Sequence, residues 1–176
     1  MPLPTSTLVL GGAASGKSLY AENLVRESGG RPLYIATAQA LDDEMQRKIA
    51  THRERRGDHW RTLEEPLSLV NALKDNNSAD AVILVDCLTL WLSNLVSEGR
   101  DIPVEIENLI QVLPLLSASV VFVSNELGLG VVPSNDAARH FRNLHGAMNQ
   151  SVAASAEQVI FVTAGLPSVL KGASGT

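Results

Sequence analysis

The segment Gly11–Ser18, GGAASGKS, constrains the fold of this chain more than any other part of the sequence. It follows the apolar run Thr7–Leu10 and precedes the amphipathic segment Leu19–Glu27, which is the order strand, glycine loop, helix. In that context the loop N–H groups point at a phosphate and the helix dipole attracts it. We expect Lys17 to reach the β- and γ-phosphates of a nucleotide and Ser18 to hold Mg²⁺. The predicted phosphate-binding residues are Gly11, Gly12, Ala13, Ala14, Ser15, Gly16, Lys17 and Ser18.

Five short apolar runs are almost continuous in Val, Ile and Leu, as in strands that are buried on both faces. Helical patterns separate these runs, so we predict an α/β fold in which helices cover both faces of a mostly parallel sheet. Such sheets bind ligands at the carboxyl ends of their strands. A short extra edge strand is also predicted within 60–65. The predicted main strands are Thr7–Leu10, Leu33–Thr37, Ala81–Val85, Val120–Val123 and Val159–Thr163.

Helices are predicted from the periodicity of the apolar residues between these runs. Glycine and proline between 99 and 103 indicate that two of the helices are separated there. The predicted helices are Leu19–Glu27, one around Leu41–Ile49, Leu67–Leu73, Leu88–Val96, Val104–Leu116 and Ala137–Ala154.

The composition is that of a globular protein, with 45% hydrophobic and 19% charged residues in a chain of 176. We predict one nucleotide-binding domain that covers residues 1–176. The net charge of −5 argues against nucleic acid as a partner. No apolar run is long enough to span a membrane and no signal peptide is visible, so we expect a cytoplasmic protein. A single cysteine, Cys87, excludes an internal disulfide and a zinc site made of several cysteines.

Positive charge is concentrated in one short region, although the chain as a whole is acidic. This pattern favours an anion-binding site there. The alternative is a solvated helix face on which nearby acidic residues balance the charge. The basic residues concerned are Arg47, Lys48, Arg53, Arg55, Arg56 and Arg61.

His52 falls on the same helical stripe as Leu41, Met45 and Ile49, so we expect it to face inward. A neutral imidazole can attack phosphorus and form a covalent intermediate, with the neighbouring guanidinium groups stabilising the phosphoryl oxygens. From the residues alone, however, a histidine on an apolar stripe is more often a packed core residue than a nucleophile. His59, His140 and His145 show no ligand-like spacing, and we predict structural or surface roles for them.

Asp86 ends the apolar run AVILVD. An acidic residue in this place of a phosphate-loop protein serves Mg²⁺, although it can instead cap the following helix. The glycine-containing segment Asn125–Asp136 follows the next run and is predicted to be a long loop at the ligand end of the sheet. Glu126 and Asn135 are candidates for substrate contacts there, and turn chemistry is the alternative.

Together, these segments resemble the family of bifunctional adenosylcobinamide kinase/adenosylcobinamide-phosphate guanylyltransferases. The resemblance covers nearly the whole chain and is most specific where several motifs combine. These stretches are LVLGGAASGKS, LYIATAQALDDEM, THRERR with HWRTLEEP, VDCLTLWLSNL, VSNELGLGVVPSNDAARHFRNLHGAMNQ and VIFVTAGLP.

The resemblance implies a P-loop, RecA-like fold and two activities. ATP or GTP phosphorylates the aminopropanol hydroxyl of adenosylcobinamide, and GTP then transfers GMP onto that phosphate. It implies a GMP–histidine intermediate on His52, a corrinoid substrate, Mg²⁺ and a homotrimer. A simple kinase, a nucleotide-gated regulatory module and a RecA-like strand-binding motor are the alternatives.

The resemblance also implies further nucleotide-binding residues, with His52 and Lys17 as the catalytic pair and Ser18 and Asp86 as metal ligands. Some relatives have Glu in the place of Asp86. Because the side chain of Asp is shorter, the resemblance does not decide whether Asp86 contacts the nucleotide directly. The implied nucleotide-binding residues beyond the loop are Ile35, Ala36, Thr37, Arg53, Glu54, Arg55, Arg56, Glu64 and Asp86.

Overall fold

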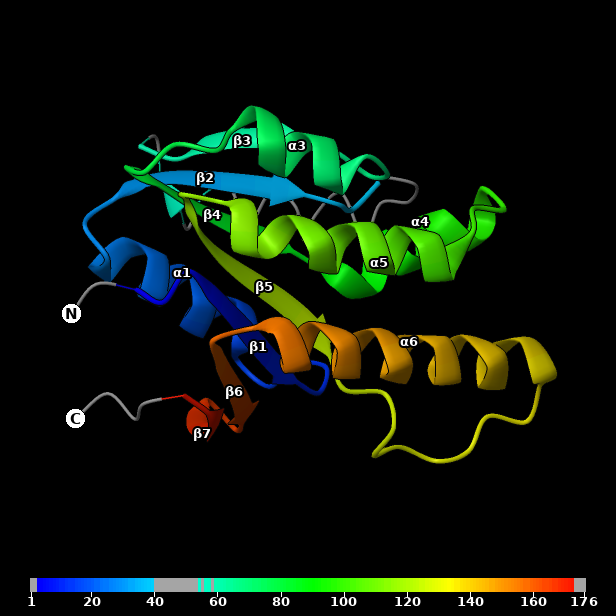
Figure 1. Ribbon diagram of the computed structural model, residues 1–176. Coiled ribbons are helices and arrows are strands. Elements are labelled where there is room, and N and C mark those ends of the chain that lie inside the picture. The colour runs from blue at the N-terminus through cyan, green and yellow to red at the C-terminus, as the bar shows by residue number, and fades with distance from the viewer. Residues whose placement is uncertain (1–2, 40–53, 55, 58, 173–176) are drawn as a thin grey trace.

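The computed structural model describes residues 3–39, 54, 56–57 and 59–172. Its described residues form a seven-stranded sheet in the order β3-β2-β4-β5-β1-β6-β7 (Figure 1). Every neighbouring pair is parallel except β6 with β7, which is antiparallel. The strands are β1 Ser6–Gly11, β2 Arg31–Ala36, β3 Arg61–Glu64, β4 Ala81–Asp86, β5 Ser119–Asn125, β6 Gln158–Thr163 and β7 Leu166–Lys171.

Helices cover both faces of this sheet, as the sequence predicts. Helix α1, Lys17–Glu27, packs against one face, where it contacts β1, β4, β5 and β6. The opposite face carries the longest helix, α6, with three shorter helices and a turn of 3₁₀ helix (Figure 1). These elements are α3 Leu69–Asp75, α4 Leu88–Ser97, α5 Ile102–Val112, η1 Leu113–Leu115 and α6 Asp136–Ser155.

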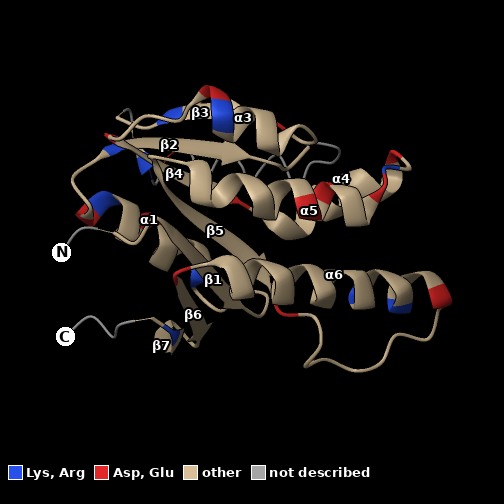
Figure 2. Cartoon of the chain, viewed as in Figure 1, with Lys and Arg blue, Asp and Glu red and all other residues tan. Residues whose placement is uncertain are grey.

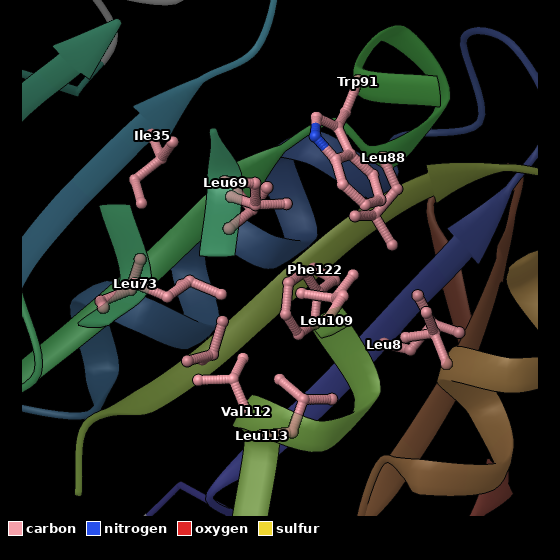
Figure 3. Close-up of a cluster of buried hydrophobic side chains, with 14 of the residues drawn as sticks. Leu8, Ile35, Leu69, Leu73, Leu88, Trp91, Leu109, Val112, Leu113 and Phe122 are labelled. Carbon is pink, nitrogen blue, oxygen red and sulfur yellow. The ribbon is translucent and has the colours of Figure 1, made fainter. Parts of the chain in front are cut away.

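The helices of the second face present few charges to the sheet. Helix α4 has no charged residue, and those of α6 are confined to its first half, as Figure 2 shows. The large apolar core lies beneath these helices, with Trp91, Leu109 and Phe122 fully buried (Figure 3). Burying one such side chain contributes about 1.5–3 kcal/mol to the free energy of unfolding. The packing of these helices therefore stabilises the sheet, and with it the carboxyl ends of the strands, where a ligand is predicted to bind.

The five predicted main strands and the weaker edge strand are confirmed, the last as β3. The predicted helix 104–116 is wrong at its end, because α5 stops at Val112 and η1 follows. Pro114 in that 3₁₀ turn lacks the N–H that a continuing α-helix requires. The stripe Leu41–Ile49 lies outside the described residues. Within the described residues, the structure contains no helix that is long and apolar enough to cross a membrane.

Strand β7 was not predicted from the sequence. Its residues are mostly exposed, so Leu166–Lys171 lacks the continuous apolar pattern of the central strands. A two-residue turn, Ala164 and Gly165, connects it to β6, and both residues have positive φ, at 52° and 78°. This backbone is that of a tight hairpin.

A candidate phosphate-transfer site

The glycine loop lies between β1 and α1, at the carboxyl end of a central strand. Gly16 has a φ of 92°, and a Cβ there would lie 3.1 Å from the Cα of Gly165. A Cβ on Gly11 would lie 2.5 Å from the Oγ of Ser15 and 2.6 Å from the carbonyl oxygen of Val162. Both positions therefore require glycine, one for its backbone conformation and one for space.

Two neighbouring segments hold the loop through main-chain hydrogen bonds. The N–H of Gly165, in the β6–β7 turn, donates to the carbonyl oxygen of Ser15 at 2.8 Å. The N–H of Glu126, just after β5, donates to the carbonyl oxygen of Gly11 at 3.0 Å. The loop is thus preorganised by its neighbours, and the unpredicted hairpin β6–β7 is one of them.

Lys17 is placed as a phosphate ligand would be. Its side chain is largely buried, with 9% of the residue exposed, and Nζ donates to the carbonyl oxygen of Gly12 at 3.1 Å. An ammonium group has three donors, so this bond leaves capacity for phosphate oxygens. Burial lowers the pKa of Lys17, while the acidic groups Cys87 and Asp86 act in the opposite direction.

Ser15 supplies a second sign that the loop fits an anion. Among the described residues, its Oγ is buried without a hydrogen-bond partner. The hydroxyl faces Gly11 across the loop, because a Cβ added to Gly11 would lie 2.5 Å from it. Burying a hydroxyl without a hydrogen-bond partner lowers the stability of the fold. A phosphate oxygen in the loop would accept a hydrogen bond from this hydroxyl.

Asp86 lies at the carboxyl end of β4, where Tyr34 Oη donates to its Oδ2 at 3.3 Å. Burial, followed by the charge of Asp86, raises the pKa of Tyr34 well above its usual range, so Tyr34 remains a donor. The N-cap position of α4, the alternative role predicted for Asp86, belongs to the buried Cys87.

Ser18 and Asp86 offer a hydroxyl and a carboxylate, the hard oxygen ligands that Mg²⁺ prefers. The described residues contain no group of three or more His, Cys, Asp or Glu side chains that could hold a metal. A protein site with few ligands still fits Mg²⁺, because this ion keeps several waters and takes further oxygens from substrate phosphates. The donor set therefore fits the predicted metal, and the assignment of the two ligands stays a prediction.

The predicted residues at the end of β2 are placed differently from one another. Ile35 is fully buried in the core, and Ala36 ends the strand. The hydroxyl of Thr37 donates to the carbonyl oxygen of Cys87 at 2.7 Å and accepts from its N–H at 2.8 Å. Glu64, at the end of β3, pairs with Ala36 and is exposed. Nucleotide contacts by these residues remain predictions.

The basic region predicted to bind an anion is described only in part. His52, Arg53 and Arg55 lie outside the described residues, and Glu54 is exposed. Arg56 is 3% exposed, and its guanidinium carbon lies 3.4 Å from the centre of the Tyr34 ring.

The guanidinium group of Arg56 also pairs with a buried carboxylate of α1. Its Nη1 lies 3.7 Å from Oε1 of Glu22. Among the described residues, Nε and Nη1 have no hydrogen-bond partner. The structure thus brings Arg56, Tyr34 and Asp86 close to the helix of the phosphate loop, and a nucleotide contact by Arg56 stays a prediction.

Sequence reasoning missed a buried polar group on the opposite face of the sheet. His145 is 1% exposed and bonds Thr89, Ser124 and Asn149, which agrees with a structural role. The available signal was the spacing of His145 and Asn149, because residues four apart share one helix face. Both lie on the buried face of α6.

The other polar candidates of the sequence have local roles in the structure. Asn135 caps α6, where its side chain accepts from the N–H of Ala138 at 2.7 Å. The Oε1 of Glu126 accepts from the N–H of Gly128. His59 and His140 are exposed. Substrate contacts by Asn135 and Glu126 stay predictions.

Comparison with known proteins agrees with this geometry. A protein from Pseudomonas aeruginosa named bifunctional adenosylcobalamin biosynthesis protein CobP is 50% identical over 94% of this chain and 96% of its own length. The Escherichia coli protein named bifunctional adenosylcobalamin biosynthesis protein CobU is 41% identical over 90% of this chain and 96% of its own length.

Solved structures add evidence on the fold alone. An ATPase from the type III secretion system of pathogenic bacteria superposes with a TM-score of 0.58 at 11% identity, covering 92% of this chain and 51% of that one. The fold is thus that of the P-loop, RecA-like nucleoside triphosphatases.

The model of one protein family matches residues 7–170, which include the glycine loop, the region of His52 and all the described strands apart from Ser6 of β1 and Lys171 of β7. Its description is cobinamide kinase/cobinamide phosphate guanyltransferase. The match spans most of the chain, and the relatives agree with it in name and length. The chain therefore belongs to the cobinamide kinase/cobinamide phosphate guanyltransferase family of bifunctional enzymes.

Proposed function

We propose that this protein phosphorylates adenosylcobinamide with ATP or GTP and then transfers GMP from GTP to the product, through a GMP–histidine on His52. The end product is adenosylcobinamide-GDP, an intermediate of cobalamin assembly. The observation that carries the proposal is the family match across both the glycine loop and the region of His52. The buried lysine and the orphaned serine hydroxyl of the loop support it.

In the kinase step, the hydroxyl oxygen of the aminopropanol arm bonds to the γ-phosphorus. The bond from that phosphorus to the bridging oxygen breaks, the nucleoside diphosphate leaves and the hydroxyl proton is released to solvent. Lys17 and the loop N–H groups bind the phosphate oxygens and stabilise the charge that develops on them. Ser18 and Asp86 would hold Mg²⁺, which would supply further positive charge to the phosphate oxygens.

In the guanylyl step, a neutral His52 nitrogen bonds to the α-phosphorus of GTP and pyrophosphate leaves. An oxygen of the cobinamide phosphate then bonds to the same phosphorus, and the bond to His52 breaks. Two displacements replace one difficult step, which is the advantage of covalent catalysis. Lys17 and the glycine loop bind the departing pyrophosphate.

The covalent step is tested by the intact mass of the protein after incubation with GTP and Mg²⁺. We expect one added guanylyl group on the wild-type protein, stable to base and labile to acid, and none on His52→Ala. His140→Ala is the matched control, because His140 is exposed and distant in sequence. A guanylyl group that persists on His52→Ala contradicts the assignment, and phosphorylation without any adduct indicates a simple kinase.

The kinase step is tested with Lys17→Ala and adenosylcobinamide as acceptor. Loss of a charged donor in a dry site costs roughly 2–4 kcal/mol, so we expect a turnover about 30- to 1000-fold lower. Lys74→Ala, at an exposed lysine of α3, should retain wild-type turnover. Unchanged turnover of Lys17→Ala would contradict the role given to Lys17.

We also propose that the protein assembles as a homotrimer, which its resemblance to the family implies. Sedimentation equilibrium of the full chain measures this directly. A single species of three times the chain mass supports the proposal, and a monomer over the whole concentration range overturns it.

A further inference from the structure

Strand β2 holds the end of its neighbour β4 through side chains as well as through the main-chain ladder. The two strands are parallel, and Ala36 stands in register with Asp86. Tyr34 lies two residues before Ala36, so its side chain is on the same face of the sheet as that of Asp86. The hydroxyl of Tyr34 donates to Oδ2 of Asp86 at 3.3 Å. A hydrogen bond to one oxygen restrains the rotation of a carboxylate, so Tyr34 sets the direction in which Asp86 presents its oxygens.

The ring of Tyr34 is itself held in place by two neighbours. The guanidinium carbon of Arg56 lies 3.4 Å from the centre of the ring. The ring of Trp60 stands nearly perpendicular to it, at 74°, with the two ring centres 6.5 Å apart. The exposed fraction is 6% for Tyr34 and 7% for Trp60. Packing therefore determines where the hydroxyl of Tyr34 lies, and the hydroxyl in turn orients the carboxylate.

Thr37, directly after β2, holds the main chain around Asp86. Its N–H donates to the carbonyl oxygen of Asp86 at 3.3 Å. Its hydroxyl donates to the carbonyl oxygen of Cys87 at 2.7 Å and accepts from the N–H of Cys87 at 2.8 Å. Thr37 and Cys87 are both buried, and a buried hydrogen bond is stronger than one in water. One residue therefore binds three successive main-chain groups, which leaves the backbone that carries Asp86 little freedom.

The same bonds limit what the hydroxyl of Thr37 can do for a nucleotide. A hydroxyl has one proton to donate, and that of Thr37 goes to Cys87. It therefore cannot donate to a phosphate oxygen while this bond is made. The geometry favours an action of Thr37 through Asp86 over the direct nucleotide contact that the resemblance implies.

Asp86 is the group on which both residues act, and it lies at the edge of the sheet that binds phosphates. Strands β1 and β4 both flank β5, so Asp86 and the phosphate loop share the carboxyl ends of neighbouring strands. Asp86 is half-buried, so part of its surface remains accessible to a ligand. Groups that hydrogen-bond a metal ligand orient it, and their loss typically lowers metal affinity by about 10- to 100-fold.

We propose that Tyr34 and Thr37 are positioning residues that orient Asp86 toward the Mg²⁺ bound with the nucleotide. The proposal rests on the nucleotide site proposed above and adds two residues to it. Tyr34 acts on the carboxylate, and Thr37 acts on the main chain that carries it. Neither residue touches the nucleotide, so both affect nucleotide binding only when the metal is present.

The test measures the affinity for ATP calorimetrically, once with Mg²⁺ and once with excess EDTA, and it needs no corrinoid. Tyr34→Phe removes only the hydroxyl and keeps the ring that packs against Arg56 and Trp60. Its affinity for ATP should fall roughly 10- to 100-fold with Mg²⁺ and should equal that of the wild type in EDTA. Tyr20→Phe, at the partly buried tyrosine of α1, is the matched control and should bind as the wild type does. Equal losses in both conditions, or no loss, overturn the role of Tyr34.

A double-mutant cycle asks whether Tyr34 acts through Asp86. Asp86→Asn removes the charge of the carboxylate and lowers the affinity for ATP with Mg²⁺. In that background, Tyr34→Phe should cause no further loss, because the carboxylate that it orients is already absent. A purely structural effect of Tyr34→Phe would add to the loss from Asp86→Asn, so additive losses overturn the positioning role.

Thr37→Val removes both hydroxyl bonds to Cys87 at nearly constant volume, and it should lower the affinity for ATP with Mg²⁺ but not in EDTA. Thr37→Ser keeps the hydroxyl and should restore wild-type affinity. Thr62→Val, at an exposed threonine of β3, is the matched control. A loss in both conditions, as a direct nucleotide contact would cause, or no loss overturns the role of Thr37. If Thr37→Val does not fold, as judged by urea unfolding, Thr37→Ala takes its place, because its smaller side chain admits water to Cys87.

The two proposals fail separately in these experiments. A wild-type protein that does not phosphorylate adenosylcobinamide contradicts the proposed function, yet its ATP affinities with and without Mg²⁺ still decide the roles of Tyr34 and Thr37. If Mg²⁺ does not raise the wild-type affinity for ATP, the positioning roles are overturned, while the two transfer activities are measured independently.

Discussion

Two buried polar clusters lie on opposite faces of the sheet, and they differ in charge. The Arg56 cluster, which comprises Glu22, Tyr34 and Arg56, lies on the face covered by α1 and contains two charges. The His145 cluster, which comprises Thr89, Ser124, His145 and Asn149, lies on the other face and consists of polar side chains without carboxylate, ammonium or guanidinium groups.

The two clusters also differ in how completely their hydrogen bonds are made. In the described residues, Arg56 has two buried nitrogens without a hydrogen-bond partner, and its contact with Glu22 is long at 3.7 Å. Every side chain of the His145 cluster is bonded within it. A half-satisfied charge is costly to bury, so the Arg56 cluster depends on each partner more strongly than the neutral one.

The largest expected effect is therefore on the charged cluster. Arg56→Met removes a cation that lies beside the buried carboxylate of Glu22, which should lower the free energy of unfolding by about 3–5 kcal/mol. Adding Glu22→Leu should recover much of this loss, because an apolar pair of similar volume avoids the buried charge. Urea unfolding of the wild type and these two variants measures both effects. A single variant as stable as the wild type would show that the two clusters do not differ in this way.

The next effect breaks the neutral cluster. Asn149→Leu removes the acceptor of Ser124 and the donor to the Asn125 carbonyl oxygen. Each stranded group costs about 1–3 kcal/mol when it is buried, and urea unfolding should show the sum. Asn149→Leu with Ser124→Ala removes one of these orphans and should be more stable than Asn149→Leu alone. The opposite order would contradict the hydrogen-bond assignment.

A smaller effect is expected from the N-cap of α6, and it tests whether this cap and the His145 cluster contribute independently to stability. Asn135→Ala removes the cap of α6 and should cost about 1 kcal/mol, whereas Asn135→Ser should retain most of it. His145 lies ten residues further along, about 15 Å up the helix, so this loss should add to that of Asn149→Leu. Coupling between the two variants in urea unfolding would mean that the cap and the cluster form one unit.

The smallest effect concerns pH. Burial lowers the pKa of His145, with the charge of Glu126 acting in the opposite direction. As the pH falls below about 6.5, the unfolded chain binds a proton that the native imidazole resists, so the native state loses stability. His145→Gln should show a weaker fall of the unfolding free energy over this range than the wild type. His140→Gln, at an exposed histidine, should leave the dependence as it is.

Much of the site was predictable because its signals are local. The glycine loop, Lys17 and Asp86 each lie at the end of an apolar run, and the rule that parallel strands bind ligands at their carboxyl ends places them together. The edge strand β3 and the long loop after Asn125 were also predicted. The loop is confirmed as a glycine turn between β1 and α1, where Gly11 has no room for a side chain and Gly16 has a positive φ.

The rest depends on contacts that no local pattern records. Strand β7 pairs at an edge with mostly exposed residues, so it has no apolar period, yet the turn before it bonds Ser15. Nothing in the local sequence distinguishes Thr89 and Ser124 from other polar residues. Their shared partner, His145, is supplied by α6 when this helix packs on the sheet. Arg56 was predicted from its charge as an anion ligand, and only packing shows that it lies on Tyr34.

The sequence by itself determined the phosphate loop, the order of strands and helices and the class of chemistry, because glycine spacing and apolar periodicity act over a few residues. The tertiary structure alone decided which polar side chains are buried together on either face of the sheet. The reason is that a buried hydrogen bond joins residues as far apart as Thr89 and His145, and its partner is fixed only when helices pack on the sheet.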